Sequence, residues 1–167
     1  MSVEILVNRA MPFDASLLAA LHANCFAKAW DAAEMAQFIA APDTICLIAS
    51  AVDTTGGAPA GFLIARKAVD EAELLTLCVL PAHRGLGLAR ALMREAMDVL
   101  RSSGATQLFL EVADGNQAAL RLYSSLGAVR VGQRKGYYEH GADAAIFSLA
   151  LSSGPDDDGA ALARRQA

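Results

Sequence analysis

The sequence predicts an α/β fold, and two observations carry that prediction. Residues 74–81 form an apolar, strand-like run that enters the glycine-rich turn RGLGLA, and this turn opens directly into an amphipathic helix. A second short apolar run, 106–112, has helix-like segments on both sides. Strands that alternate with helices in this way form βαβ units whose central strands run parallel.

The first half of the chain is expected to contain two helices and four strands. Asp14 is a good N-cap for a helix that runs to about Phe26 and buries that ring in the core. Asp31 and Glu34 form a D-x-x-E variant of the capping box, so a second helix is expected through about Ala40. The strands are expected at 3–9, 44–52, 60–69 and 73–79, with a hairpin loop at 53–59 and a tight turn at 70–71.

The second half is expected to contain two more helices and three strands. Apolar residues from Leu88 to Leu100 fall on one helical stripe, and Gly104 ends that helix. Asn116 starts the next helix and Gly127 ends it. The strands are expected at 106–112, 129–134 and 144–151, with an aromatic, polar connection at 136–143. Residues 1–151 are thus expected to form one domain, and 152–167, which lack apolar periodicity, a flexible tail.

Size and composition restrict the class of protein. The chain has 167 residues, enough for one domain with a substantial core, and 54% of them are hydrophobic. Its net charge of −4 gives no electrostatic case for nucleic-acid binding. The N-terminal strand lacks the features of a signal peptide, and no apolar run is long enough to cross a bilayer. A cytoplasmic protein with no membrane association is therefore expected.

The cysteines and histidines predict no metal site. Cys25, Cys46 and Cys78 are odd in number, widely spaced and each in an apolar context, so reduced and buried thiols are expected. The three histidines show no metal-ligand spacing with one another or with the cysteines.

The turn between residues 84 and 89 has the composition of an anion site. Its R-x-x-G-x-A pattern places Arg84, Gly85 and Gly87 before a helix N-terminus, where backbone N–H groups and the helix dipole favour phosphate. A P-loop is excluded because Lys-Ser or Lys-Thr does not follow Gly87. A dinucleotide fingerprint fails because Arg90 stands at its third glycine. The alternative is a tight strand-to-helix turn that binds no ligand.

Four further residues each have a functional and a structural interpretation. Glu111 ends an apolar strand, where partial burial would make it a better base, or it simply reaches solvent. Tyr123 fits the apolar stripe of its helix and alone is more typical of a core residue than of a catalyst. Asn116 is either a ligand contact or a plain helix cap. Trp30, between two helices, is either a core residue or the wall of a binding groove.

Together, these segments resemble the GNAT superfamily of acetyl-CoA-dependent N-acetyltransferases. The resemblance runs from about Val3 to Leu151 and rests on the order of elements, on R-x-x-G-x-A, and on LEVADGNQAALRLYSSLGA and RKGYYEHGADA. Within the superfamily, these motifs are most similar to the RimI branch, which acetylates the N-terminal alanine of a small-subunit ribosomal protein. The resemblance implies an α+β form of the α/β fold, with a mixed, mostly antiparallel sheet splayed around the acetyl-CoA cleft and helices on its flanks.

The resemblance also implies a role for each motif residue. Glu111 would be the general base, acting through water, and Tyr123 would protonate the departing CoA thiolate. Acetyl-CoA would be the co-substrate without any metal, and a peptide or protein N-terminus, such as that of a ribosomal protein, would be the acceptor. Acetyl-CoA would be bound by Leu77, Cys78, Val79, Arg84, Gly85, Leu86, Gly87, Leu88, Ala89 and Asn116, and the acceptor by Trp30, Tyr137 and Tyr138.

Three positions depart from the pattern of the branch. Ala113 replaces the basic residue usual after L-E-V, Ala128 replaces the Phe usual after L-G, and Ala29 replaces the Pro common before Trp30. Two of these changes touch elements near the expected acceptor groove. They bear on the identity of the acceptor more than on the chemistry.

Amine chemistry independently favours an α-amine acceptor. Aminolysis needs a neutral amine, and at pH 7 roughly 10% of an α-amine but only about 0.04% of a lysine side chain is neutral. A single carboxylate base suits the easier acceptor, although desolvation could recover the difference for lysine. Acetylation of a small amine or a lysine, and a non-catalytic acyl-CoA-binding module, are the alternatives. Direct transfer is expected rather than an acetylated Cys78, because nothing nearby in the sequence would lower the pKa of that thiol.

Overall fold

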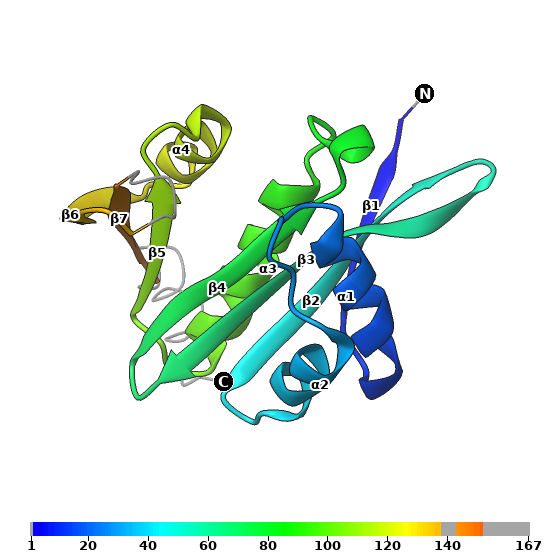
Figure 1. Ribbon diagram of the computed structural model, residues 1–167, viewed down its shortest axis with the longest axis horizontal. Helices are drawn as coiled ribbons and strands as arrows, with labels where there is room; N and C mark the ends of the chain where they lie inside the picture. Colours follow the sequence, from blue (N-terminus) through cyan, green and yellow to red (C-terminus); the bar gives the residue numbers. More distant parts are fainter. Residues whose placement is uncertain (1, 138–142, 152–167) are drawn as a thin grey trace, which may run out of the picture.

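The structure is a computed structural model that describes residues 2–137 and 143–151. Within this part of the chain, seven strands form one sheet in the order β1-β2-β3-β4-β5-β7-β6 (Figure 1). The strands are β1 (Glu4–Arg9), β2 (Thr44–Asp53), β3 (Gly56–Ala68), β4 (Glu71–Val79), β5 (Gln107–Ala113), β6 (Val129–Arg134) and β7 (Ala144–Ala150). The helices are α1 (Ala15–Ala23), α2 (Ala32–Ala40), α3 (Leu88–Ser102) and α4 (Gln117–Ser125), with short 3-10 turns at Pro12–Asp14 and Pro81–His83. Tyr138 and the expected tail at 152–167 lie outside the described residues.

The pairing of the strands confirms a mixed, mostly antiparallel sheet. β4 and β5 form the parallel pair, and the other neighbouring strands are antiparallel. The parallel pair joins the two strands that precede α3 and α4, as the βαβ pattern predicts.

β4 and β5 are paired over only part of their lengths. Their register joins Glu71–Glu73 to Gln107–Phe109, although β4 continues to Val79 and β5 to Ala113. Figure 1 shows the two strands diverging beyond this paired end. A β-bulge at Leu75, between the pairs that Leu74 and Thr76 form with β3, increases the local twist of β4. The sheet therefore opens between the two strands, and β5 does not pair with the backbone of Leu74–Val79.

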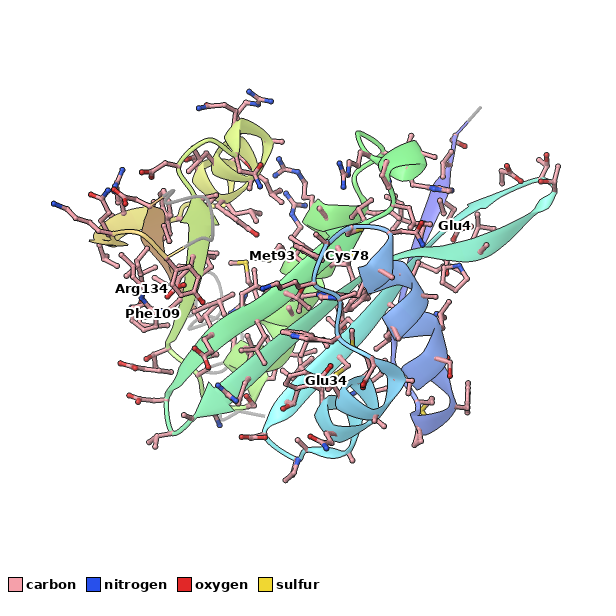
Figure 2. The ribbon with its side chains drawn as sticks, viewed as in Figure 1. Glu4, Glu34, Cys78, Met93, Phe109 and Arg134 are labelled. Atoms are coloured by element: carbon pink, nitrogen blue, oxygen red, sulfur yellow. The ribbon has the colours of Figure 1, made fainter. Side chains whose placement is uncertain are left out.

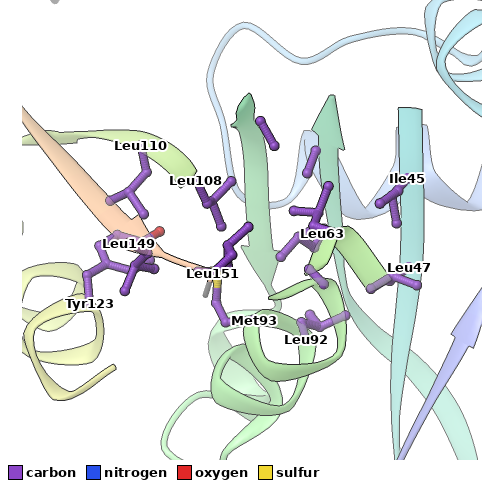
Figure 3. Packing of buried hydrophobic residues seen from close by; sticks show 14 of the residues in the cluster. Ile45, Leu47, Leu63, Leu92, Met93, Leu108, Leu110, Tyr123, Leu149 and Leu151 are labelled. Carbon is purple, nitrogen blue, oxygen red and sulfur yellow. The ribbon is translucent and has the colours of Figure 1, made fainter. Parts of the chain in front are cut away.

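Two hydrophobic clusters lie on opposite faces of the sheet. α3 and α4 cover one face, and Figure 3 shows Met93 of α3 and Tyr123 of α4 among the buried leucines of β5 and β7. α1 and α2 cover the other face, where Leu18 and Met35 pack in one cluster with Phe62. No helix in the described part of the chain is long and apolar enough to span a bilayer.

The helix signals are confirmed for α2 and corrected for α1. Asp31 Oδ1 accepts the Glu34 N–H at 2.9 Å, and the Glu34 carboxylate accepts the Asp31 N–H at 2.8 Å, which completes the capping box. α1 ends at Ala23, so Phe26 is outside the helix and 42% exposed rather than part of the core. Beyond Ala23, the backbone N–H groups of Cys25 and Phe26 both donate to the His22 carbonyl, and the backbone N–H of Trp30 donates to His22 Nδ1 at 3.0 Å.

The hairpin expected at 53–59 is present, but its loop is shorter than expected, because β2 continues to Asp53 and β3 begins at Gly56. Two donors of Thr55 close the turn by bonding to the Asp53 carboxylate: the backbone N–H at 2.7 Å and the side-chain hydroxyl at 2.6 Å. Pro59 lies inside β3 opposite Ser50, next to a register shift at Ala49/Ser50. A proline is tolerated in a strand beside such an irregularity, because the ladder is interrupted there.

Candidate active site

A cleft of about 760 Å³ lies between the end of β4, the turn into α3, and α4, on the side where β4 and β5 diverge. Its lining comes from both faces of the sheet. Leu88 and Tyr123 belong to the cluster under α3 and α4, whereas Cys78 belongs to the cluster under α1 and α2. The cleft therefore reaches through the opening in the sheet.

The N-terminus of α3 presents backbone donors to this cleft. Gly85 and Gly87 line it with φ angles of 81° and 96°, in the left-handed region that glycine adopts at no steric cost. The Ala91 N–H donates to the Gly87 carbonyl at 3.0 Å. The N–H groups of Leu88, Ala89 and Arg90 precede that bond and have no acceptor within the helix. Such amides, together with the helix dipole, suit a phosphate group.

The end of β4 is tied to this turn through one carbonyl oxygen. Arg84 Nε donates to the Val79 oxygen at 3.1 Å, and the Cys25 thiol donates to the same oxygen at 3.5 Å. The terminal nitrogens of Arg84 remain to pair with an anion. Behind β4, a Cβ at Gly61 would lie 2.7 Å from the Cys78 carbonyl oxygen, so glycine there permits the close approach of β3.

Tyr123 and Asn116 each have a structural role in the fold and also line the cleft. Tyr123 is only 6% exposed, packs in the core and also lines the cleft. Asn116 Oδ1 accepts the Ala119 N–H at 3.1 Å, so it caps α4, and it lines the cleft as well. Both residues are thus held in place by the fold while they face the space that a ligand would occupy.

Glu111 lies on β5 next to the opening but is not among the side chains that line the cleft. Its neighbours Leu110 and Val112 are buried under α3 and α4, so Glu111 points to the opposite face of the sheet. Its side chain is 28% exposed, and Glu111 Oε1 lies 3.1 Å from Arg134 Nη2 in an ion pair.

Most of the residues expected to bind acetyl-CoA come together in the cleft. Leu77, Cys78, Val79, Arg84, Gly85, Gly87, Leu88, Ala89 and Asn116 line it, whereas Leu86 does not and is 45% exposed. The described residues expected at the acceptor lie elsewhere. Trp30 is half-buried between α1 and α2, and Tyr137 is 50% exposed after β6. The roles of these side chains remain predictions.

Sequence reasoning missed two arginines that line the cleft. Arg90 is on α3, and its Nη2 donates to Ser125 Oγ of α4 at 2.8 Å, which links the two helices. Arg121 is on the exposed side of α4. The available signal was one arginine within the first two turns of each of two helices that follow the strands bordering the opening.

The thiols differ from expectation at one position. Cys46 and Cys78 are buried, but Cys25 is half-buried and lines the cleft, because it lies in the segment after α1. Cys78 Sγ donates to the Leu21 carbonyl at 3.3 Å. Burial, followed by contact with the Cys25 thiol, raises the pKa of Cys78. A buried, protonated thiol is a poor nucleophile, which favours direct transfer. The described residues contain no group of three or more His, Cys, Asp or Glu that could hold a metal.

Comparison with known proteins agrees with this arrangement. Residues 16–128 match the acetyltransferase (GNAT) family. The N-alpha-acetyltransferase RimI of Mycobacterium tuberculosis is 37% identical over 144 residues, 84% of this chain and 88% of that protein. The ribosomal protein bS18-alanine N-acetyltransferase of Escherichia coli K12 is 38% identical over 102 residues, 59% of this chain and 69% of that protein.

The fold comparison leads to the same family. The crystal structure of the ribosomal-protein-S18-alanine N-acetyltransferase from Escherichia coli superimposes with a TM-score of 0.78 and 27% identity, covering 90% of this chain and 96% of that one. The chain therefore belongs to the GNAT family of acetyltransferases and is an acetyl-CoA-dependent N-acetyltransferase.

Proposed function

We propose that this enzyme transfers acetyl from acetyl-CoA to the N-terminal α-amine of a protein, such as a small-subunit ribosomal protein. One observation carries the proposal: the opening between β4 and β5 has bare amides of α3 on its cleft side and the Glu111 carboxylate on the other face. The choice of acceptor is supported by relatives at 37–38% identity that are named N-alpha-acetyltransferase RimI and ribosomal protein bS18-alanine N-acetyltransferase.

In this proposal, acetyl-CoA lies along the cleft. The turn at 84–89, with the free amides at the start of α3, and the Arg84 guanidinium hold the diphosphate, since backbone amides and a guanidinium both donate to anions. The pantetheine arm runs beside Leu77–Val79, where β5 leaves the edge of β4 unpaired. The thioester then lies at the opening between β4 and β5, within reach of the Tyr123 side chain, which lines the cleft.

The acceptor amine approaches from the face on which Glu111 lies. Its nitrogen attacks the thioester carbonyl carbon and forms a tetrahedral intermediate, while the proton that it loses passes to Glu111 through water. The carbon–sulfur bond then breaks, and the departing CoA thiolate takes the proton of the Tyr123 hydroxyl. The acetylated amine and CoA leave. Glu111 then releases its proton to solvent, and Tyr123 takes one up.

A peptide library that varies the first residues tests the acceptor class. Each peptide is incubated with acetyl-CoA, CoA release is measured as free thiol, and mass spectrometry locates the acetyl group. We expect acetyl on the N-terminal nitrogen. Acetylation confined to lysines or small amines would contradict the proposal, as would acetyl-CoA binding without turnover on any acceptor.

Two variants test the assigned roles. Glu111→Gln and Tyr123→Phe are expected to lower kcat by about 10²- to 10⁴-fold, the usual contribution of a general base or acid. The KM for acetyl-CoA should change little. Glu95→Gln, an exposed carboxylate on α3 outside the cleft, is the matched control and should retain full activity. Normal turnover of both Glu111→Gln and Tyr123→Phe on the true acceptor would show that the roles are wrong.

A further inference from the structure

We propose that Arg134 is a specificity-determining residue: its guanidinium makes the acceptor site select an amine that arrives neutral, and hence an α-amine over a lysine side chain. The inference rests on the proposed function, because it concerns the same acceptor site. It goes beyond that function by naming the residue and the force that discriminate between the two classes of amine.

The position of Arg134 follows from the strand order. Arg134 ends β6 and pairs with Ala144 of β7, while Glu111 of β5 pairs with Ile146 of β7. To reach Glu111, the Arg134 side chain must cross β7. Ala144 and its partner on β5, Ala113, are small enough to let it pass, and Ala144 is 0% exposed. Figure 2 shows Arg134 on the half of the sheet formed by β5, β7 and β6.

A second contact, with the Tyr137 ring, also restrains the guanidinium. Arg134 Cζ lies 4.7 Å from the centroid of the Tyr137 ring, in a cation–π arrangement. The segment between them is anchored by Asp143, whose carboxylate accepts the Gly136 N–H at 2.8 Å and the Gln133 side-chain amide at 2.7 Å. The positive charge is therefore held beside Glu111.

The other nearby cation of β6 is engaged elsewhere. Arg130 lies 3.9 Å from Asp114, so it belongs to a different ion pair. Arg130 and Arg134 are on the same strand, and their side chains are 51% and 53% exposed. Arg130 is thus a matched control for the charge, length and exposure of Arg134.

The charge next to Glu111 acts differently on the two classes of amine. A protonated amine that approaches the carboxylate also approaches the guanidinium and is repelled, whereas a neutral amine is not. At pH 7, roughly one α-amine in ten is neutral, against about one lysine side chain in 2,500. Arg134 therefore penalises lysine most, because lysine almost always arrives charged.

A peptide with a free N-terminus and one internal lysine tests this directly. The measured quantity is the ratio of kcat/KM for α-acetylation to that for ε-acetylation, with each product located by mass spectrometry. In Arg134→Gln we expect the ratio to fall by about tenfold, mainly because ε-acetylation becomes faster. Arg134→Lys, which keeps a cation, and Arg130→Gln should both keep the wild-type ratio.

The kinetic constants separate selection from a merely structural role. In Arg134→Gln, the KM for the lysine amine should fall, because the protonated amine can now bind beside Glu111 and lose its proton there. General damage would instead raise KM and leave the ratio unchanged. Salt gives a readout that needs no variant: about 0.5 M NaCl should lower the wild-type ratio towards that of Arg134→Gln, since the pair is partly exposed and can be screened.

The outcomes distinguish this inference from the function on which it rests. An unchanged ratio in Arg134→Gln, or an equal fall in Arg130→Gln, overturns the role of Arg134 while the function stands. Wild-type enzyme that acetylates no α-amine overturns the proposed function itself. Melting temperatures confirm that the variants are folded, and if Arg134→Gln does not fold, a wild-type ratio that does not respond to salt overturns the inference.

Discussion

The indole of Trp30 stacks on the imidazole of His22, with ring centroids 4.8 Å apart and ring planes 10° apart. The backbone N–H of Trp30 donates to His22 Nδ1, and the ring of Phe38 on α2 packs against the indole with ring centroids 4.9 Å apart. Trp30 therefore packs, half-buried, between α1 and α2. The buried His22 ring is neutral in this arrangement, because its Nδ1 accepts a hydrogen bond.

The buried His22 predicts a loss of stability in acid. Burial lowers the pKa of His22, and the nearby Glu34 opposes part of that effect. The unfolded chain, with a pKa of about 6.5, then takes up a proton before the folded chain does. The free energy of unfolding should be highest above about pH 6.5 and fall as the pH drops below it. Urea unfolding at about pH 7.5 and 5.5 measures the loss. If His22→Gln loses as much stability as wild type over that range, His22 is not the cause.

Gly87→Ala should weaken acetyl-CoA binding as well as stability. The left-handed φ of 96° costs an alanine about 1–2 kcal/mol, and relief of that strain would move the amides that face the cleft. We expect the KM for acetyl-CoA to rise several-fold. Gly104→Ala is the control, because its φ of 97° lies at the far end of α3. If the two variants have equal melting temperatures and both keep the wild-type KM for acetyl-CoA, the turn is not an anion site.

Arg121→Gln should raise the KM for acetyl-CoA by about 3- to 10-fold, because a charge-assisted contact to a phosphate is lost. The effect should shrink at high salt, since Arg121 is exposed and its charge is screened. Arg94→Gln removes an exposed arginine of α3 that does not line the cleft, and should leave the KM unchanged. If the two variants have the same KM for acetyl-CoA, Arg121 is not part of the acetyl-CoA site.

Cys78→Ala should keep most of the activity. The thiol is 2% exposed, donates to the Leu21 carbonyl and has a raised pKa, so it is not expected to carry an acetyl group. The loss of one buried sulfur should cost about 1 kcal/mol of stability. Steady-state kinetics and thermal unfolding measure both effects. Nearly complete loss of turnover in a folded variant would instead indicate a covalent intermediate on Cys78.

Local signals in the sequence predicted those parts of the fold that local chemistry determines. The capping box at Asp31 and Glu34, and the glycines after α3 and α4, marked helix ends correctly. The turn between β3 and β4 was misplaced because Val69 adopts a left-handed φ of 58°, which a β-branched residue rarely does. The Thr106 N–H donates to the Asp70 carbonyl at 2.7 Å, so a residue far along the chain holds that turn.

The candidate site also has parts that a local motif predicts and parts that depend on the tertiary fold. The turn at 84–89 follows from a short motif, and its composition alone predicted an anion site. The pairing of Arg134 with Glu111 depends on β7 lying between β5 and β6, which no local pattern reveals. The same holds for Arg121, which reaches the cleft only because α4 packs beside the opening.

In the proposed mechanism, the opening between β4 and β5 joins an acetyl-CoA cleft to an acceptor site at Glu111. A crystal structure with a bisubstrate analogue, in which a peptide α-nitrogen is linked to CoA, tests both halves at once. We expect the diphosphate at the turn of residues 84–89 and the peptide nitrogen beside the Glu111 carboxylate. A diphosphate bound elsewhere, or a peptide nitrogen on the side away from Glu111, would contradict it.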